Sequence, residues 1–307
     1  MRLTGMGFGA AGMVAAVLAG TMSSASAQPV GVTGCAGWQT DTLASGLGQL
    51  ENLETDGNGG FYVSGADAHK LYDVDASGNV TVALDATGGP LGLQRDGSTL
   101  YFMGRADSGA GVQALDTTTG AVTHITDMGG NGLLRLPNGD LLTTWVGTEG
   151  GPSAGVTRYD HDTGAVQPNW GPVPRGEGLA LSPDHAAVYT DDLFTGQVYR
   201  IPLNDPAHWT VVGRVDGLLP GDDDLTAAAD GSLYVAAHIG GSIVRMDPAT
   251  GATCAIATSI SPGWNGPASV RIGPDGEGWA LYVSAFDGTL RRIRPPADVD
   301  LAPVQTS

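Results

Sequence analysis

The chain has 307 residues, 49 of them glycine, and its formal net charge at pH 7 is −18. Such an acidic chain repels nucleic acid and anionic lipid, and no basic stretch offsets this repulsion. Its only lysine is Lys70, which argues against Schiff-base chemistry. We therefore expect a monomer that acts on a small-molecule substrate, with no nucleic-acid or membrane partner.

The first 27 residues have the pattern of a secretory signal peptide. Arg2 supplies a positive charge, a weakly apolar stretch runs to about Gly20, and Ala25-Ser-Ala27 is a small-residue cleavage signal. The apolar stretch is too short and too rich in glycine for a transmembrane helix. We expect cleavage after Ala27 and a secreted or periplasmic protein, with an unstructured tail as the alternative.

A nine-residue phrase then occurs six times without a gap. Its third residue is Leu or Val in every copy, and its eighth is Asn or Asp. The copies lie 38–46 residues apart and begin at Glu51, Gly89, Asn131, Glu177, Asp223 and Ala268. This period is typical of a β-propeller blade.

Each phrase is followed by two further β-prone runs, and in the first five repeats a fourth strand can form before the next copy. The second strands are expected at 61–63, 100–102, 141–142, 187–189, 233–235 and 281–283, and the third at 71–74, 112–115, 156–159, 198–201, 243–246 and 290–293. Four antiparallel strands make one blade. The sequence predicts an all-β, six-bladed propeller that forms a single domain over residues 28–307, with blades at about 36–296 and a polar tail at 297–307.

The sixth repeat lacks a fourth strand of its own, because Arg294-Pro-Pro296 follows its third. Residues 38–44 form a β-prone run that belongs to no other blade. We predict that this run pairs with residues 290–293 and closes the ring, which removes the free edge strands. Cys35 precedes the closing strand and Cys254 lies in the last strand of the neighbouring blade, which predicts a disulfide; two buried thiols are the alternative.

The first residue of each phrase is the candidate functional position. The innermost strand of a blade begins at one mouth of the central channel, so four polar side chains would meet there: Glu51, Asn131, Glu177 and Asp223. The three carboxylates would repel one another strongly unless a cation neutralised them. An all-oxygen ligand set favours Ca²⁺, with Mg²⁺, Mn²⁺ or Zn²⁺ as alternatives. The competing explanation is that these side chains only cap backbone amides or hold channel waters.

The second strands end at the same mouth and add candidates for substrate contact, namely Arg105, Trp145, Asp192, His238 and Phe286. A histidine in this place could move a proton or donate a hydrogen bond to a substrate carbonyl, although a single histidine at a strand end is often structural. Asp191 and Asp192 are adjacent, so only one of them can face the channel.

These phrases resemble the SMP-30/gluconolactonase/LRE-like family over nearly all of residues 36–296. Glu51 occupies the position of the family's first metal ligand, and Asp223-Asp-Leu matches the aspartate ligand that the family also uses as general base. Glu177-Gly-Leu-Ala-Leu-Ser-Pro-Asp-His185, followed by Val188-Tyr-Thr-Asp191, is similar to the family phrase S-N-G-L-x-x-S-P-D-x…Y-x-x-D. Asn131 falls where the family has a substrate-facing asparagine that can reach the metal.

The resemblance implies a six-bladed propeller with a divalent cation bound by Glu51, Glu177, Asp223 and Asn131. Four departures stand out. Glu177 replaces the usual asparagine, and Glu51-Asn-Leu replaces an E-G-P or E-S-P opening. Asn131-Gly-Leu replaces N-D-G, and Asp223-Asp224 replaces D-G. The metal ligands survive these changes, whereas the substrate-binding residues of the family are not all recognisable.

The predicted function is a metal-dependent hydrolase of a cyclic ester, that is, a lactonase. Asp223 would take the proton of water and Asn131 would orient the substrate. Two alternatives stay open. One is a non-catalytic propeller that binds a ligand or partner around a structural cation, and the other is a different reaction on the same scaffold, such as that of a lyase or a strictosidine-synthase-like enzyme.

Overall fold

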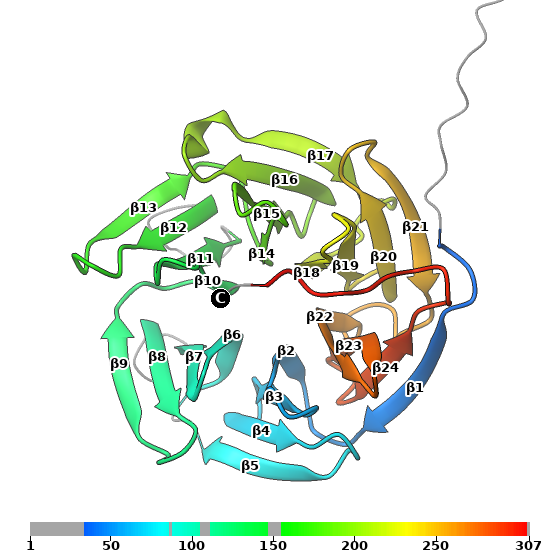
Figure 1. The fold of residues 1–307 in the computed structure, drawn as a ribbon, viewed down its shortest axis with the longest axis horizontal. Helices are drawn as coiled ribbons and strands as arrows, with labels where there is room; N and C mark the ends of the chain where they lie inside the picture. Colours follow the sequence, from blue (N-terminus) through cyan, green and yellow to red (C-terminus); the bar gives the residue numbers. More distant parts are fainter. Residues whose placement is uncertain (1–33, 86–87, 105–110, 147–154, 306–307) are drawn as a thin grey trace, which may run out of the picture. The chain divides into compact units, whose positions relative to one another are not determined.

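The computed structural model describes residues 34–85, 88–104, 111–146 and 155–305. These residues form six antiparallel four-stranded sheets, arranged as blades around a central axis (Figure 1). The predicted all-β, six-bladed propeller is therefore confirmed. The expected signal peptide lies outside the described residues, and so does Arg105. No helix within the described part of the chain is long and apolar enough to cross a membrane.

In each of the first five blades the strands are consecutive in the chain and pair in order. Blade 1 contains β2 (Leu50–Thr55), β3 (Phe61–Gly65), β4 (Lys70–Val74) and β5 (Val80–Asp85). Blade 2 contains β6 (Pro90–Asp96), β7 (Thr99–Gly104), β8 (Gly111–Asp116) and β9 (Val122–Thr126). Blade 3 contains β10 (Leu133–Arg135), β11 (Leu141–Trp145), β12 (Gly155–Tyr159) and β13 (Val166–Gly171).

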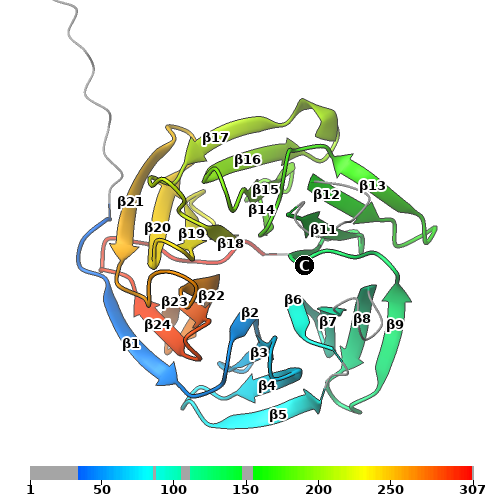
Figure 2. The same ribbon diagram turned by 180° about the vertical axis from the view of Figure 1, so that it is seen from behind.

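Blade 4 contains β14 (Ala180–Leu181), β15 (Ala187–Asp191), β16 (Gln197–Pro202) and β17 (Thr210–Arg214), with the short 3₁₀ helix η2 (Pro206–His208) before its last strand. Blade 5 contains β18 (Asp222–Ala227), β19 (Leu233–Ala237), β20 (Ser242–Asp247) and β21 (Ala252–Ala257). Blade 6 contains β22 (Pro267–Asp275), β23 (Gly278–Ala285), β24 (Leu290–Arg294) and β1 (Gln39–Ala44). In every blade the first strand in this order lies nearest the axis (Figures 1 and 2).

Aspartates at the ends of third strands fix the turns that follow. The side-chain oxygens of Asp75, Asp116, Asp160 and Asp247 accept hydrogen bonds from backbone N–H groups two or three residues further on. Such bonds favour a turn over a continued strand, because the side chain satisfies amides that the ladder leaves free. The turns between third and fourth strands are thus specified locally.

The hydrophobic core lies between the blades. Six clusters of buried side chains are present among the described residues, and each joins two neighbouring blades. In one of them, Leu71 of blade 1 packs against Leu93 and Phe102 of blade 2. Because each blade buries its faces only against its two neighbours, closure of the ring completes the core.

The predicted closing strand is confirmed. β1 pairs antiparallel with β24, with Thr40 opposite Ile293 and Ala44 opposite Leu290. Arg292 and Arg294 both contact the carboxylate of Asp41, at 2.7 and 3.1 Å, and both also contact Asp275. The hydrogen bond from Arg292 lowers the pKa of Asp41. The first strand of the propeller is thus joined to the last by a backbone ladder and a network of ion pairs.

The segment after β24 departs from the expected polar tail. It crosses one face of the ring toward the axis (Figure 1), and Val299 and Leu301 are buried. Ala229 donates a backbone hydrogen bond to Ala302 at 2.8 Å, and Pro303 forms an isolated β-bridge with Ala228. Leu301 packs in the buried cluster between blades 5 and 6, and the bridge of Pro303 to Ala228 fixes the segment on blade 5.

The predicted disulfide between Cys35 and Cys254 is present, and it links the segment before β1 to the last strand of blade 5 across 219 residues. We expect the double variant Cys35→Ser/Cys254→Ser to be less stable by roughly 2–4 kcal/mol, because the bond closes a very long loop in the unfolded chain. Denaturant unfolding of both proteins measures this difference. Reductant should destabilise the wild type and leave the variant unchanged; equal stability of the two proteins would contradict the prediction.

Candidate metal centre

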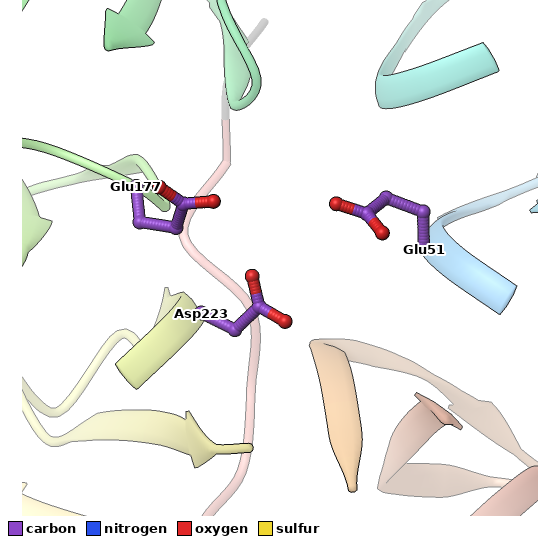
Figure 3. A group of neighbouring side chains, drawn as sticks. All are labelled: Glu51, Glu177 and Asp223. Atoms are coloured by element: carbon purple, nitrogen blue, oxygen red, sulfur yellow. The ribbon is translucent and has the colours of Figure 1, made fainter. Parts of the chain in front are cut away.

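Three carboxylates converge at the mouth of the channel where the inner strands begin. Oxygens of Glu51, Glu177 and Asp223 lie within 4.8 Å of one another. Figure 3 shows the three side chains turned toward a common point from different blades. Glu51 and Asp223 are the second residues of β2 and β18, and Glu177 precedes β14. Three first residues of the repeat phrase thus lie together at this mouth.

Irregular strand pairing directs these side chains to the axis. In blade 5, Asp222 pairs with Ala237 and Asp224 with Ala236, which leaves Asp223 as an extra residue. Blade 6 has the same shift at Ala268, and blade 1 has a shift that includes Glu51. A β-bulge of this kind re-aims a side chain that would otherwise follow the alternation of the strand.

In blades 3 and 4, side chains of the second strands accept hydrogen bonds from backbone amides that follow the first residue of the phrase. Gly132 N donates to Thr144 Oγ1 at 2.8 Å, and Gly178 N donates to Asp191 Oδ1 at 2.7 Å. Both glycines are also required by close packing, because a β-carbon on Gly178 would lie 2.6 Å from Asp224 of the next blade, and one on Gly132 would collide with the Glu177 carbonyl. The backbone around Asn131 and Glu177 is therefore held rigidly.

Asn131 bridges two of the carboxylates. Its Nδ2 donates to Glu51 Oε1 at 3.2 Å and also to Glu177 Oε1. Glu177 is 4% exposed, and its other oxygen, Oε2, is buried and receives no hydrogen bond from the described residues. Burial raises the pKa of Glu177 well above its ordinary value, and the charges of Asp223 and Glu51 raise it further. The site therefore has an excess of negative charge with unused acceptor capacity.

Asp223 is in contact with a histidine. His238 Nδ1 lies 3.2 Å from Asp223 Oδ2, and the histidine ring packs edge-on against Phe286 with ring centroids 4.8 Å apart. Burial raises the pKa of Asp223, and the contact with His238 opposes this. Burial lowers the pKa of His238, but Asp223 outweighs burial and the net shift is upward. The contact with His238 therefore offsets only part of the effect of burial, and the pKa of Asp223 stays above its ordinary value.

A second layer of polar residues lies one residue further along the inner strands. Asn52 Nδ2 of blade 1 donates to Asp224 of blade 5 at 3.2 Å, and Leu93 N of blade 2 donates to Asn52 at 3.3 Å. Asp224 also accepts from Arg271 at 2.5 Å and from Ser269. This layer joins four blades and separates the carboxylates from a cavity of about 500 Å³, lined by Glu54 and Arg95 among others, at the opposite mouth.

The other predicted residues, at the ends of second strands, differ in how they lie relative to the three carboxylates. The Asp192 side chain is 1% exposed and accepts from the turn amides of Phe194 and Thr195, while Arg175 lies 3.2 Å from its Oδ1. Of the adjacent pair, Asp191 is the one that lies toward Asp223 and Asp224. Burial raises the pKa of Asp191 to about 8, and the charges of Asp224 and Asp223 contribute to this rise. Trp145 ends β11 at this mouth and is half-buried.

Sequence reasoning missed Arg175 and Asp222. Arg175 stands two residues before Glu177, and its guanidinium lies 5.1 Å from the ring centroid of Phe194. Asp222 is fully buried, and neither of its carboxylate oxygens has a hydrogen-bond partner among the described residues. Burial raises its pKa well above the ordinary value. The run of three aspartates at 222–224 was visible in the sequence, but only the fold shows that its members face different surroundings.

The residues fit a hard divalent cation. The three carboxylates supply oxygen donors only, and the unpartnered Oε2 of Glu177 is the kind of acceptor that a cation would satisfy. Glu51, Glu177 and Asp223 would bind the ion. Asn131 presents its Nδ2 to two of these carboxylates, so its amide would have to turn over to offer Oδ1 to the same ion. The donor set does not distinguish Ca²⁺ from Mg²⁺ or Mn²⁺.

Comparisons with known proteins identify the same fold. No protein-family model matches the chain, and no curated protein sequence matches it. Its structure is similar to a gluconolactonase from Xanthomonas campestris, with a TM-score of 0.69 and 17% identity over 84% of this chain and 90% of that one. It is also similar to regucalcin, a calcium-binding protein from Agrobacterium tumefaciens strain C58, with a TM-score of 0.64 and 18% identity over 84% and 94%.

A virginiamycin B lyase from Staphylococcus aureus is similar as well, with a TM-score of 0.57 and 15% identity over 84% of this chain and 98% of the lyase. The expected resemblance to gluconolactonase-type propellers is thus confirmed for the fold. At these identities the likeness concerns the fold alone, and propellers of this kind include both hydrolases and lyases.

Added cation should stabilise the protein. A ligand that binds only the folded state at 100 times its dissociation constant contributes about 2.7 kcal/mol, so Ca²⁺ or Mn²⁺ should raise the melting temperature and a chelator should reverse this.

Glu177→Gln should lower cation affinity about tenfold or more, because a charged ligand is lost. Without cation the same variant should be no less stable than the wild type, since the amide relieves repulsion. Calorimetric titration measures the affinities for the cation. Glu277→Gln, at an exposed position, is the control. Equal affinity of the two variants would contradict the assignment of Glu177 as a cation ligand.

Proposed function

We propose that the protein is a divalent-metal-dependent hydrolase of cyclic esters. The observation that carries this proposal is the convergence of Glu51, Glu177 and Asp223 at one mouth, with Asp223 in contact with His238. A purely structural ion site would not need a carboxylate that is also oriented by a histidine. The structural similarity to a gluconolactonase is consistent with the proposal.

The chain's own residues account for the proton transfers of lactone hydrolysis. Asp223 accepts a proton from water as the water oxygen forms a bond to the lactone carbonyl carbon. His238 holds the carboxylate of Asp223 in place, and Asn131 donates a hydrogen bond to the substrate. The ring C–O bond then breaks, and the departing oxygen takes up a proton to give a hydroxy acid. A bound divalent cation would supply a Lewis acid for the substrate carbonyl.

Export of the protein is part of the proposal. A disulfide between Cys35 and Cys254 is stable in an oxidising compartment and unusual in a reducing cytosol. The sequence pattern of residues 1–27, with its cleavage signal at Ala25–Ala27, supports the same conclusion. We infer a secreted or periplasmic enzyme.

A lyase is the second candidate, and the similarity to virginiamycin B lyase favours it specifically. An aspartate–histidine pair beside a cation could also remove a proton from carbon and so open an ester by elimination. The two reactions differ in the fate of water. Turnover in H₂¹⁸O should place ¹⁸O in the product carboxylate if the enzyme is a hydrolase, whereas a lyase product would carry a new double bond and no label.

Asp223→Asn should separate catalysis from cation binding. The amide retains an oxygen donor but cannot accept the proton of water, so turnover of the best lactone substrate should fall by about 10²-fold or more while some cation binding persists. Release of acid, followed with a pH indicator at saturating cation, measures the rate. Asp298→Asn, an exposed aspartate away from the mouth, should keep full activity. Undiminished activity of Asp223→Asn would remove Asp223 as the base.

A further inference from the structure

Exposed apolar side chains gather at the mouth that holds the candidate metal centre. Most exposed large apolar residues elsewhere in the described chain are valines that lie singly on outer strands, namely Val82, Val122, Val166 and Val211. Single residues of this kind are normal on a protein surface. Four larger ones instead occupy loops at the mouth and are 39–98% exposed: Phe194, Leu218, Leu219 and Trp264. We call these four residues the apolar rim.

The loops of the apolar rim belong to three consecutive blades and are bonded to one another. The loop with Phe194 joins β15 to β16, and its Gly196 O accepts from Val215 N at 2.8 Å at the start of the loop with Leu218 and Leu219. That second loop is tied to residues after β19, because Gly240 N donates to Pro220 O at 2.9 Å. The third loop follows, since Gly263 N donates to Ile239 O at 2.9 Å beside Trp264.

The apolar rim is continuous with the interior of the site. The loop that carries Leu218 and Leu219 leads directly into Asp222 and Asp223 of β18. The loop with Trp264 is bonded to Phe286, whose N donates to Gly266 O at 3.0 Å. Phe286 in turn packs on His238, the residue in contact with Asp223. The loop of Trp264 is thus connected, through Phe286 and His238, to the candidate catalytic carboxylate.

We propose that the apolar rim binds a hydrophobic substituent of the substrate, so that the preferred lactone carries an alkyl or aryl chain rather than ring hydroxyls. This inference rests on the proposed function. A polyhydroxylated lactone would need hydrogen-bond partners where the rim offers apolar side chains, and unpaired hydroxyls are costly to desolvate. Burial of a chain against Phe194, Leu218 and Trp264 is instead favourable in proportion to the area removed from water.

The charges around the rim agree with a neutral chain as the occupant. Arg175 stacks on Phe194, and its guanidinium contacts Asp192. The exposed Arg214 donates to Thr195 O at 2.8 Å and to Gly217 O at 3.1 Å, so both guanidinium groups are engaged in holding the loops of the rim. The net charge of −18 also disfavours an anionic lipid surface as the occupant. A second copy of the chain is the remaining competitor, and it is an outcome of the test below.

The experiment compares γ-lactones of increasing alkyl chain length with glucono-δ-lactone, using the full-length mature protein loaded with Ca²⁺ or Mn²⁺. We expect kcat/KM to rise about twofold or more per added methylene until the chain exceeds the rim. Leu218→Ser/Leu219→Ser and Trp264→Ser should flatten this dependence. Trp279→Ser is the matched control, because Trp279 is an exposed tryptophan at the opposite mouth, and it should keep the dependence unchanged.

The outcomes separate this inference from the proposed function. Hydrolysis that is independent of chain length, or fastest with glucono-δ-lactone, would overturn the inference about the apolar rim but would still support the proposed hydrolase function. If no lactone is hydrolysed, the proposed function fails, and binding of unreactive lactams then decides the inference. Tryptophan fluorescence compares γ-decalactam, which carries an alkyl chain, with γ-butyrolactam, which has the same ring and no chain. Tighter binding of the alkyl lactam that is lost in Leu218→Ser/Leu219→Ser, which leaves Trp264 in place as the reporter, supports the rim, and equal binding overturns it. Dissociation of a dimer by Leu218→Ser/Leu219→Ser in sedimentation would also overturn it, because the rim would then be a subunit interface.

Discussion

Mutual repulsion among Glu51, Glu177 and Asp223 is the physical constraint that the fold of this protein has to overcome. Three carboxylates within 4.8 Å in a largely buried channel cannot all be ionised without compensation. The chain offers partial compensation through the amide of Asn131 and the ring of His238, and the raised pKa of Glu177 shows that this is incomplete. A divalent cation would complete it. The rest of the fold serves to keep these groups together against their repulsion.

The ring provides that restraint because no blade can move outward alone. Each blade buries its faces against two neighbours, and β1, the strand that precedes blade 1, completes blade 6. The ion pairs of Asp41 hold β1 to β24, and the Cys35–Cys254 disulfide joins the segment before β1 to blade 5. Directly beneath the carboxylates, the bonds of Asn52 and Asp224 join blades across the axis. Local bulges then orient the functional side chains without disturbing the packing of the strands behind them.

The sequence was sufficient for features that repeat or that follow from chain order. Six copies of one phrase predicted the blades and the convergence of their first residues, and the missing strand of the sixth copy predicted closure by residues 38–44. Features that depend on contacts between distant segments were not predictable. The position of Asp191 rather than Asp192 toward the channel depends on a bond to Gly178, and the partners of Asp224 come from blades 1 and 6. The packing of Leu301 on the ring depends on a surface that exists only after folding.

The central claim is that one divalent cation lies among Glu51, Glu177 and Asp223. Diffraction from crystals grown with Mn²⁺, recorded with anomalous scattering, tests it most directly. We expect an anomalous peak at the mouth of the channel, at bonding distance from an oxygen of each of the three carboxylates. A well-ordered structure with no peak there, or with the cation bound elsewhere on the acidic surface, would contradict it.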